Sequence, residues 1–120
     1  MNLQVHTRRV DEHTAVVDFQ GEMDVYTTPQ AKEAMLDLLD NGYYHLVVNL
    51  QGAEYLDSTA LGMLVGTLKR VREQGGDLRI VAPPPRIRRL FDITRLDKVF
   101  PIDLSEQDAM EYLKQEGTES

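Results

Sequence analysis

A carboxylate and two hydroxyl groups stand next to one another at the predicted start of a helix, in the stretch Asp57-Ser58-Thr59. An apolar stretch that reads as a buried strand, residues 46–50, precedes them, and an amphipathic helix over residues 61–72 follows. Side-chain oxygens at a helix N-terminus accept hydrogen bonds from free backbone N–H groups, and an added anion is best tolerated there. Ser58 is therefore either a plain helix cap or the attachment point of a regulatory phosphate.

Three features bear on the choice for Ser58. Asp57 can itself act as the cap, which leaves the Ser58 hydroxyl free in the first turn. The surrounding loop carries acidic side chains and no base that could activate a nucleophile. Ser58, Gly62 and Gly66 recur every four residues and form a smooth stripe along the helix. Because glycine inside a helix costs about 1 kcal/mol relative to alanine, the stripe predicts close approach, either of a partner or of the rest of the domain.

Composition and charge narrow the classes of partner. The chain has 120 residues, of which 42% are hydrophobic and 28% charged, and a formal net charge of −7. This acidic balance disfavours direct binding of nucleic acid or of anionic membrane surfaces, and it favours a basic protein partner. The absence of cysteine excludes disulfides and fits a reducing compartment. With no apparent signal peptide and no membrane-spanning run, a cytoplasmic location is expected.

The other polar groups have plainer interpretations. The histidines are scattered over separate elements without the spacing of metal ligands, so neither a metal site nor a cofactor is predicted. They are His6, His13 and His45. Three tyrosines flank the predicted central strand and are interpreted as half-buried packing groups. They are Tyr43, Tyr44 and Tyr55.

The elements that must position Ser58 alternate along the chain. Residues 3–7 and 14–20 are predicted to form a β-hairpin. A helix from Thr28-Pro29 to Asn41-Gly42 follows, with the Thr28 hydroxyl as its expected cap. The remaining elements are a central strand at 44–50, a helix at 61–72, a buried strand at 77–82, a short helix at 87–94, an edge strand at 99–102 and a helix capped by Ser105. Strands that alternate with helices imply parallel crossovers, and so an α/β fold with a small mixed sheet of four to five strands and about four helices. One domain over residues 1–116 is expected, followed by a disordered tail at 117–120.

Motifs over nearly the whole chain resemble those of the STAS-domain anti-anti-sigma factors. They are the loop Gly21-Glu22-Met23-Asp24 at the end of the second strand, the strand Leu46-Val47-Val48-Asn49-Leu50, the block Leu56-Asp57-Ser58-Thr59-Ala60-Leu61-Gly62, and Arg89-Leu90-Phe91-Asp92-Ile93-Thr94 with the Val99-Phe100-Pro101-Ile102 stretch. The first loop and the Asp-Ser-Thr block are specific in combination. One residue departs from the family pattern: Ala60 stands where the family usually has glycine. Alanine suits a first helical turn, but the change can narrow which kinase recognises the chain.

The resemblance implies an anti-sigma factor antagonist with a STAS fold and no enzymatic activity. On this reading, the unphosphorylated protein binds an anti-sigma factor that is also its serine kinase, and a sigma factor is released. Phosphorylation of Ser58, with Thr59 as the alternative acceptor, ends the binding, and a serine phosphatase restores it. The surface expected to contact the partner contains Glu22, Asp24, Asp57, Thr59, Gly62 and Gly66.

Two rival functions are open at this point. The same fold can serve as a scaffold or regulatory subunit of another signalling or transport complex, although the serine-centred block favours the antagonist. An enzyme with Ser58 as a hydrolytic nucleophile is the other rival. It is disfavoured, because the sequence lacks a Gly-x-Ser-x-Gly elbow and a histidine placed as a base.

Overall fold

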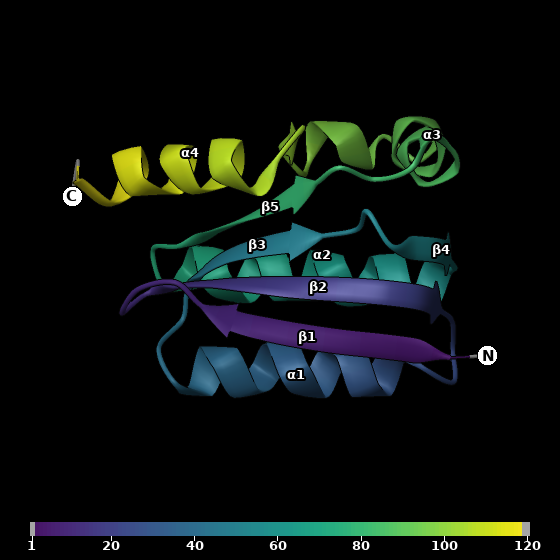
Figure 1. Cartoon of the computed structure of the whole chain (residues 1–120), viewed down its shortest axis with the longest axis horizontal. Coiled ribbons are helices and arrows are strands. Elements are labelled where there is room, and N and C mark those ends of the chain that lie inside the picture. Colours follow the sequence, from purple (N-terminus) through teal and green to yellow (C-terminus); the bar gives the residue numbers. More distant parts are fainter. Residues whose placement is uncertain (1, 119–120) are drawn as a thin grey trace.

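The computed structural model of the chain describes residues 2–118, and these residues build a mixed sheet with helices on both of its faces (Figure 1). The elements in chain order are β1 (Leu3–Arg9), β2 (Thr14–Met23), α1 (Thr28–Asp40), β3 (His45–Asn49), β4 (Ala53–Leu56), α2 (Ser58–Glu73), β5 (Asp77–Val81), α3 (Pro85–Ile93), the 3₁₀ turn η1 (Leu96–Lys98), β6 (Ile102–Asp103) and α4 (Glu106–Thr118). The predicted α/β class with a mixed sheet is confirmed.

The sheet has the strand order β1-β2-β3-β5-β6, and β4 pairs with the far end of β2. Strands β1 and β2 form the predicted antiparallel hairpin, whereas all other pairs are parallel. The sixth strand, β4, is an addition to the four or five that the sequence predicts. It continues beyond β3 along the same strand β2, so the ends of β2 and β4 lie together at one edge of the sheet (Figure 1).

The larger core lies between the sheet and the helices α1 and α2. Strand β3 is central, and its residues 46–48 are buried on both faces, as their continuous apolar pattern predicts. A smaller cluster on the opposite face joins α4 to the middle of the sheet. Its members are Val16, Val47, Val81, Ala109 and Leu113. Helix α4 thus covers only part of this second face, over β3 and β5.

Three local predictions were wrong. Residues 21–23 belong to strand β2 rather than to a loop, because they pair with β4. Thr28 is the first residue of α1 and does not cap it; Thr27 is the N-cap residue. The edge strand is Ile102–Asp103 and not 99–102, because Phe100 turns inward and packs edge-on against Phe91, with ring centroids 5.9 Å apart.

The start of α4 is capped by Ser105 and is joined to the sheet by Glu106. The hydroxyl of Ser105 accepts a hydrogen bond from the Asp108 N–H at 3.1 Å, which confirms the predicted cap. Glu106 accepts hydrogen bonds from Arg8 at 2.6 Å and from Asn49 at 2.7 Å. The backbone of α4 continues through residues 117 and 118 of the predicted tail, and residues 119–120 lie outside the described part of the chain. No helix within residues 2–118 is both long and apolar enough to cross a membrane.

Candidate functional site

Ser58 is the first residue of α2, and Asp57 sets its surroundings. Asp57 has an extended backbone, and its carboxylate accepts a hydrogen bond from the backbone N–H of Ala60 at 3.0 Å. The cap is therefore the aspartate. The side chains of Ser58 and Thr59 are exposed, and neither hydroxyl forms a hydrogen bond with any side chain or backbone group of the described residues. This leaves both hydroxyls free for chemistry from outside the domain.

The end of strand β2 is tied directly to the start of α2. Met23 pairs with Leu56 across β2 and β4, and the Met23 carbonyl accepts a hydrogen bond from the Asp57 N–H at 3.1 Å. The loop after β2 begins at the next residue, Asp24. The structure therefore brings together the two motifs that are separate in the sequence, Gly21–Asp24 and Asp57–Thr59.

Asp24 stabilises the loop that follows β2 through hydrogen bonds to its backbone. The residue is only 8% exposed, and its carboxylate accepts hydrogen bonds from the N–H groups of Tyr26 and Thr27, each at 2.9 Å. The Thr27 hydroxyl donates in turn to the Glu22 carbonyl at 2.8 Å. The hydrogen bond from the Thr27 N–H is the largest of the effects that lower the pKa of Asp24, and the one from the Tyr26 N–H adds to it. Burial acts in the opposite direction but is outweighed. Asp24 can thus contribute to a partner surface mainly through the loop that it holds.

The braced loop presents two apolar side chains to solvent. Val25 is 54% exposed and Tyr26 is 81% exposed. Tyr55 on the neighbouring strand β4 is 52% exposed, so its interpretation as a half-buried packing group was wrong. Val25 and Tyr26 were not among the predicted site residues. The available signal was an apolar pair between Asp24 and the start of α1, where it belongs to no periodic face.

The two glycines of the α2 stripe are not required by the packing of the domain itself. A Cβ atom built on Gly62 or on Gly66 meets nothing within 4 Å. Gly76 is the opposite case, since its Cβ would lie 1.8 Å from the Tyr44 carbonyl oxygen. Of the two explanations for the stripe, close approach within the domain is therefore excluded, and a smooth outer surface beside Ser58 remains.

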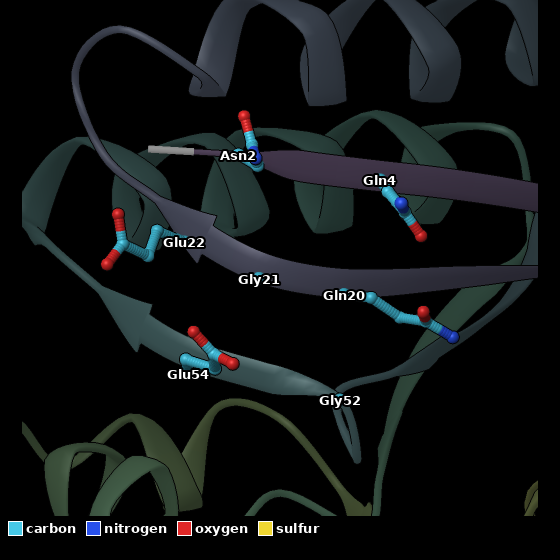
Figure 2. Close-up of a pocket in the computed structure, with 7 residues that line it drawn as sticks. All are labelled: Asn2, Gln4, Gln20, Gly21, Glu22, Gly52 and Glu54. Carbon is cyan, nitrogen blue, oxygen red and sulfur yellow. The ribbon is translucent and has the colours of Figure 1, made fainter.

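A polar hollow of about 460 Å³ lies on the part of the sheet that α4 does not cover (Figure 2). The side chains of Glu22 and Glu54 line it from the neighbouring strands β2 and β4. Residues with carboxamide side chains complete the wall, and they are Asn2, Gln4 and Gln20. The strand pair Glu22–Tyr55 also places the hollow next to the start of α2.

Among the side chains of residues 2–114, no three histidine or acidic groups lie together as metal ligands would. The chemistry that the site offers is that of an exposed alcohol on a helix N-terminus, flanked by apolar and acidic side chains. An anion on this alcohol would lie in the favourable field of the helix end and beside the Asp57 carboxylate.

Sequence and structure comparisons relate this chain to known proteins. The family model described as "STAS domain" matches residues 5–109. The anti-sigma-B factor antagonist of Staphylococcus epidermidis is 39% identical over 103 residues, which cover 86% of this chain and 94% of the relative. Its namesake from Staphylococcus aureus is 38% identical over the same shares. The crystal structure of an anti-sigma factor antagonist from Mycobacterium paratuberculosis superposes with a TM-score of 0.85 and 28% identity, covering 94% of this chain and 95% of that one.

Proposed function

This chain belongs to the STAS-domain family of anti-sigma factor antagonists, whose members are non-enzymatic regulators, and from this premise we propose that it binds an anti-sigma factor and thereby frees a sigma factor. The proposed switch is the hydroxyl of Ser58. The unphosphorylated protein binds the anti-sigma factor, and the protein with a phosphate ester on Ser58 does not. This role requires a cytoplasmic location, where sigma factors act.

The observation that carries the proposal is that Asp57, and not Ser58, caps α2. If Ser58 capped the helix, a backbone N–H would hold its oxygen, and a kinase would have to break that hydrogen bond to reach it. Because the Asp57 carboxylate caps the helix, the Ser58 oxygen can enter a kinase active site without disturbing the fold. Thr59 is also exposed and is the alternative acceptor, but its β-branched side chain is stiffer.

The proposed cycle needs two enzymes that act on this chain. The anti-sigma factor acts as a serine kinase and transfers the γ-phosphoryl group of ATP to the Ser58 oxygen, with ADP as the leaving group and the hydroxyl proton released. A serine phosphatase hydrolyses the ester and returns the alcohol and inorganic phosphate. The chain itself is only the substrate of both steps.

Local electrostatics and sterics explain why the ester would end the complex. A phosphate adds about −1.5 to −2 charges at pH 7. Within the domain the helix N-terminus favours this anion by about 0.3–1 kcal/mol, while the Asp57 carboxylate opposes it by a similar amount, so the fold should barely change. In the interface the dianion must be desolvated against a surface shaped for a hydroxyl, which costs far more.

The partner surface proposed here surrounds Ser58. Thr59 and Gly62 are exposed on the same helix, and Gly66 extends the smooth stripe. Asp57 and Asp24 hold the helix start and the loop with Val25 and Tyr26 in place. Together these residues present a preorganised surface, which reduces the entropy lost on binding.

Capture from a native lysate, with and without ATP, tests the proposed function. The immobilised wild-type chain should retain an anti-sigma factor, and ATP should release it while phosphate appears on Ser58 by mass-spectrometric mapping. The Ser58→Ala variant should retain the same factor in the presence of ATP. Phosphate on Thr59 alone would refute the Ser58 assignment. If no anti-sigma factor is captured, the role of scaffold in another complex replaces the antagonist.

A further inference from the structure

We infer that Ala60 is a positioning residue for Ser58. Its buried methyl group and its capped N–H hold the first turn of α2, and this turn presents the Ser58 oxygen to the kinase in a fixed direction. The inference rests on the proposed function, because it explains how that same serine is presented. It gives a role in phosphorylation to a residue that lies outside the proposed partner surface.

The side chain of Ala60 is enclosed by the domain. Ala60 is 0% exposed and belongs to the larger core cluster, which lies between the sheet and the helices α1 and α2. A kinase therefore cannot touch its methyl group, and the residue does not act as a recognition contact. Any effect of Ala60 on phosphorylation must pass through the backbone of the turn that carries Ser58.

Ser58 has no hydrogen bond of its own that fixes its direction. Its side chain is exposed, and its hydroxyl forms no hydrogen bond with the described residues. The same holds for Thr59, the next residue in the turn. The direction in which the Ser58 side chain leaves the backbone thus depends on the residues that anchor the turn on either side of it.

Anchors lie both before and after Ser58. Before it, the Asp57 N–H donates to the Met23 carbonyl at 3.1 Å, which ties the turn to the end of β2. After it, the Ala60 N–H donates to the Asp57 carboxylate at 3.0 Å, and the Leu61 N–H donates to the Asp57 carbonyl at 3.1 Å. Of the first three residues of α2, Ala60 is the one whose side chain is buried in the core.

Glycine at position 60 would keep the N–H that Asp57 caps, but it would loosen the turn. It removes the methyl group from the core, and glycine has more backbone freedom to lose on forming a helix than alanine has. Phosphoryl transfer needs the attacking oxygen in line with the leaving group, so a small displacement of that oxygen lowers the rate. The looser turn should hold the serine in the productive direction for a smaller fraction of the time.

The first experiment compares two alanine-to-glycine variants. Ala60→Gly loosens the turn that carries Ser58. Ala109→Gly is the matched control, because Ala109 is also 0% exposed and lies in the first turn of α4, on the opposite face of the sheet. Each variant is phosphorylated in a single turnover at saturating ATP and saturating captured anti-sigma factor. The dissociation constant of each unphosphorylated variant is measured separately, and its melting temperature shows that it is folded in the assay.

The single-turnover rate constant of Ala60→Gly should fall about fivefold, while its dissociation constant stays within about twofold of wild type. Ala109→Gly should match wild type in both quantities. Equal rate constants for the two folded variants would show that Ala60 only stabilises the fold, and they would overturn the inference while the proposed function stands. A faster reaction of Ala60→Gly would overturn it as well, because the turn would then have to open for the transfer. If no captured factor phosphorylates wild type, the proposed function has failed and the inference with it.

A second experiment does not depend on the partner. Amide hydrogen exchange, followed by NMR, reports how firmly the turn is held in each variant. The protection factors at positions 60 and 61 should fall in Ala60→Gly and stay at their wild-type values in Ala109→Gly. Unchanged protection at both positions in Ala60→Gly would mean that the buried methyl group does not hold the turn, and it would overturn the inference.

Discussion

The carboxylate of Asp57 lies 3.0 Å from the backbone nitrogen of Ala60, and this hydrogen bond decides what the neighbouring serine is free to do. Asp57 caps α2, so Ser58 occupies the first turn with an exposed side chain. The same residue donates its own N–H to the Met23 carbonyl at 3.1 Å and so joins the helix start to the loop after β2. One aspartate thus links the two motifs of the proposed partner surface.

Removing the cap should therefore cost stability, whereas removing the serine hydroxyl should not. Asp57→Ala is expected to lower the free energy of unfolding by about 1 kcal/mol, because the Ala60 N–H loses its acceptor. Ser58→Ala should stay within about 0.5 kcal/mol of wild type. Urea denaturation measures both. Asp57→Asn is the control, since asparagine caps as well as aspartate, and a loss as large as that of Asp57→Ala would contradict the capping argument.

The glycine stripe should separate stability from binding. Gly62→Ala and Gly66→Ala should each raise the free energy of unfolding by up to about 1 kcal/mol, because a Cβ atom meets nothing within 4 Å at either position. Both variants should nevertheless bind the anti-sigma factor more weakly, as the added methyl groups keep the partner surface away. Thermal unfolding and a binding titration give the two quantities. Unchanged affinity in both variants would show that the stripe is not part of the interface.

Gly76→Ala provides the contrasting case for the same measurement. Its Cβ would lie 1.8 Å from the Tyr44 carbonyl oxygen, so the backbone must move and the domain should be destabilised. This variant shows that the assay detects a glycine required by the packing of the domain itself.

Tyr26 should act as an anchor of the interface. It is 81% exposed, on a loop that Asp24 holds rigid, so its removal costs the domain little. Tyr26→Ala should weaken binding by about 2 kcal/mol and leave the melting temperature unchanged. Val10→Ala, in the β1–β2 turn, is the matched control with no expected effect. Wild-type affinity in Tyr26→Ala would exclude the loop from the interface.

Asp24→Ala should also lose affinity while remaining folded, because it releases the loop that carries Tyr26.

Glu106 should contribute to the acid sensitivity of the fold. The hydrogen bond from Asn49, with a further one from Arg8, lowers the pKa of Glu106 below its ordinary value of 4.5 despite the opposing effect of burial. The ionised group therefore adds stability above this value that is lost as pH falls through the lowered pKa. Because Arg8 is exposed, the contribution is at most about 1 kcal/mol. Between about pH 6 and pH 3, Glu106→Gln should lose less stability than wild type in urea titrations; equal losses would contradict this assignment.

The sequence predicts those parts of the fold in which apolar residues follow a clear pattern along the chain. The continuous apolar run of β3, the alternation of β1 and the apolar face of α2 each led to the observed element. The cap by Asp57 was among the alternatives because aspartate and serine are both good caps at adjacent positions. What the sequence cannot supply is the choice between them, which depends on the backbone angles of Asp57.

Other features depend on pairing that local patterns do not encode. Strand β4 is only four residues long and has two exposed residues, so it shows no alternation. It is a strand because β2 extends beyond β3 and needs a partner. Likewise, Tyr55 follows the central strand in sequence but lies on β4, where it pairs with Glu22 of β2 and is exposed.

The affinity of the bare and the Ser58-phosphorylated chain for the anti-sigma factor is the most direct test of the central claim. Both forms are prepared from the same folded protein and titrated against the factor, with Ser58→Ala and Ser58→Asp as fixed mimics of the two states. The phosphorylated form should bind about a hundredfold more weakly or worse, with Ser58→Ala matching the bare form and Ser58→Asp weakened. Equal affinity of the bare and phosphorylated forms would contradict the account.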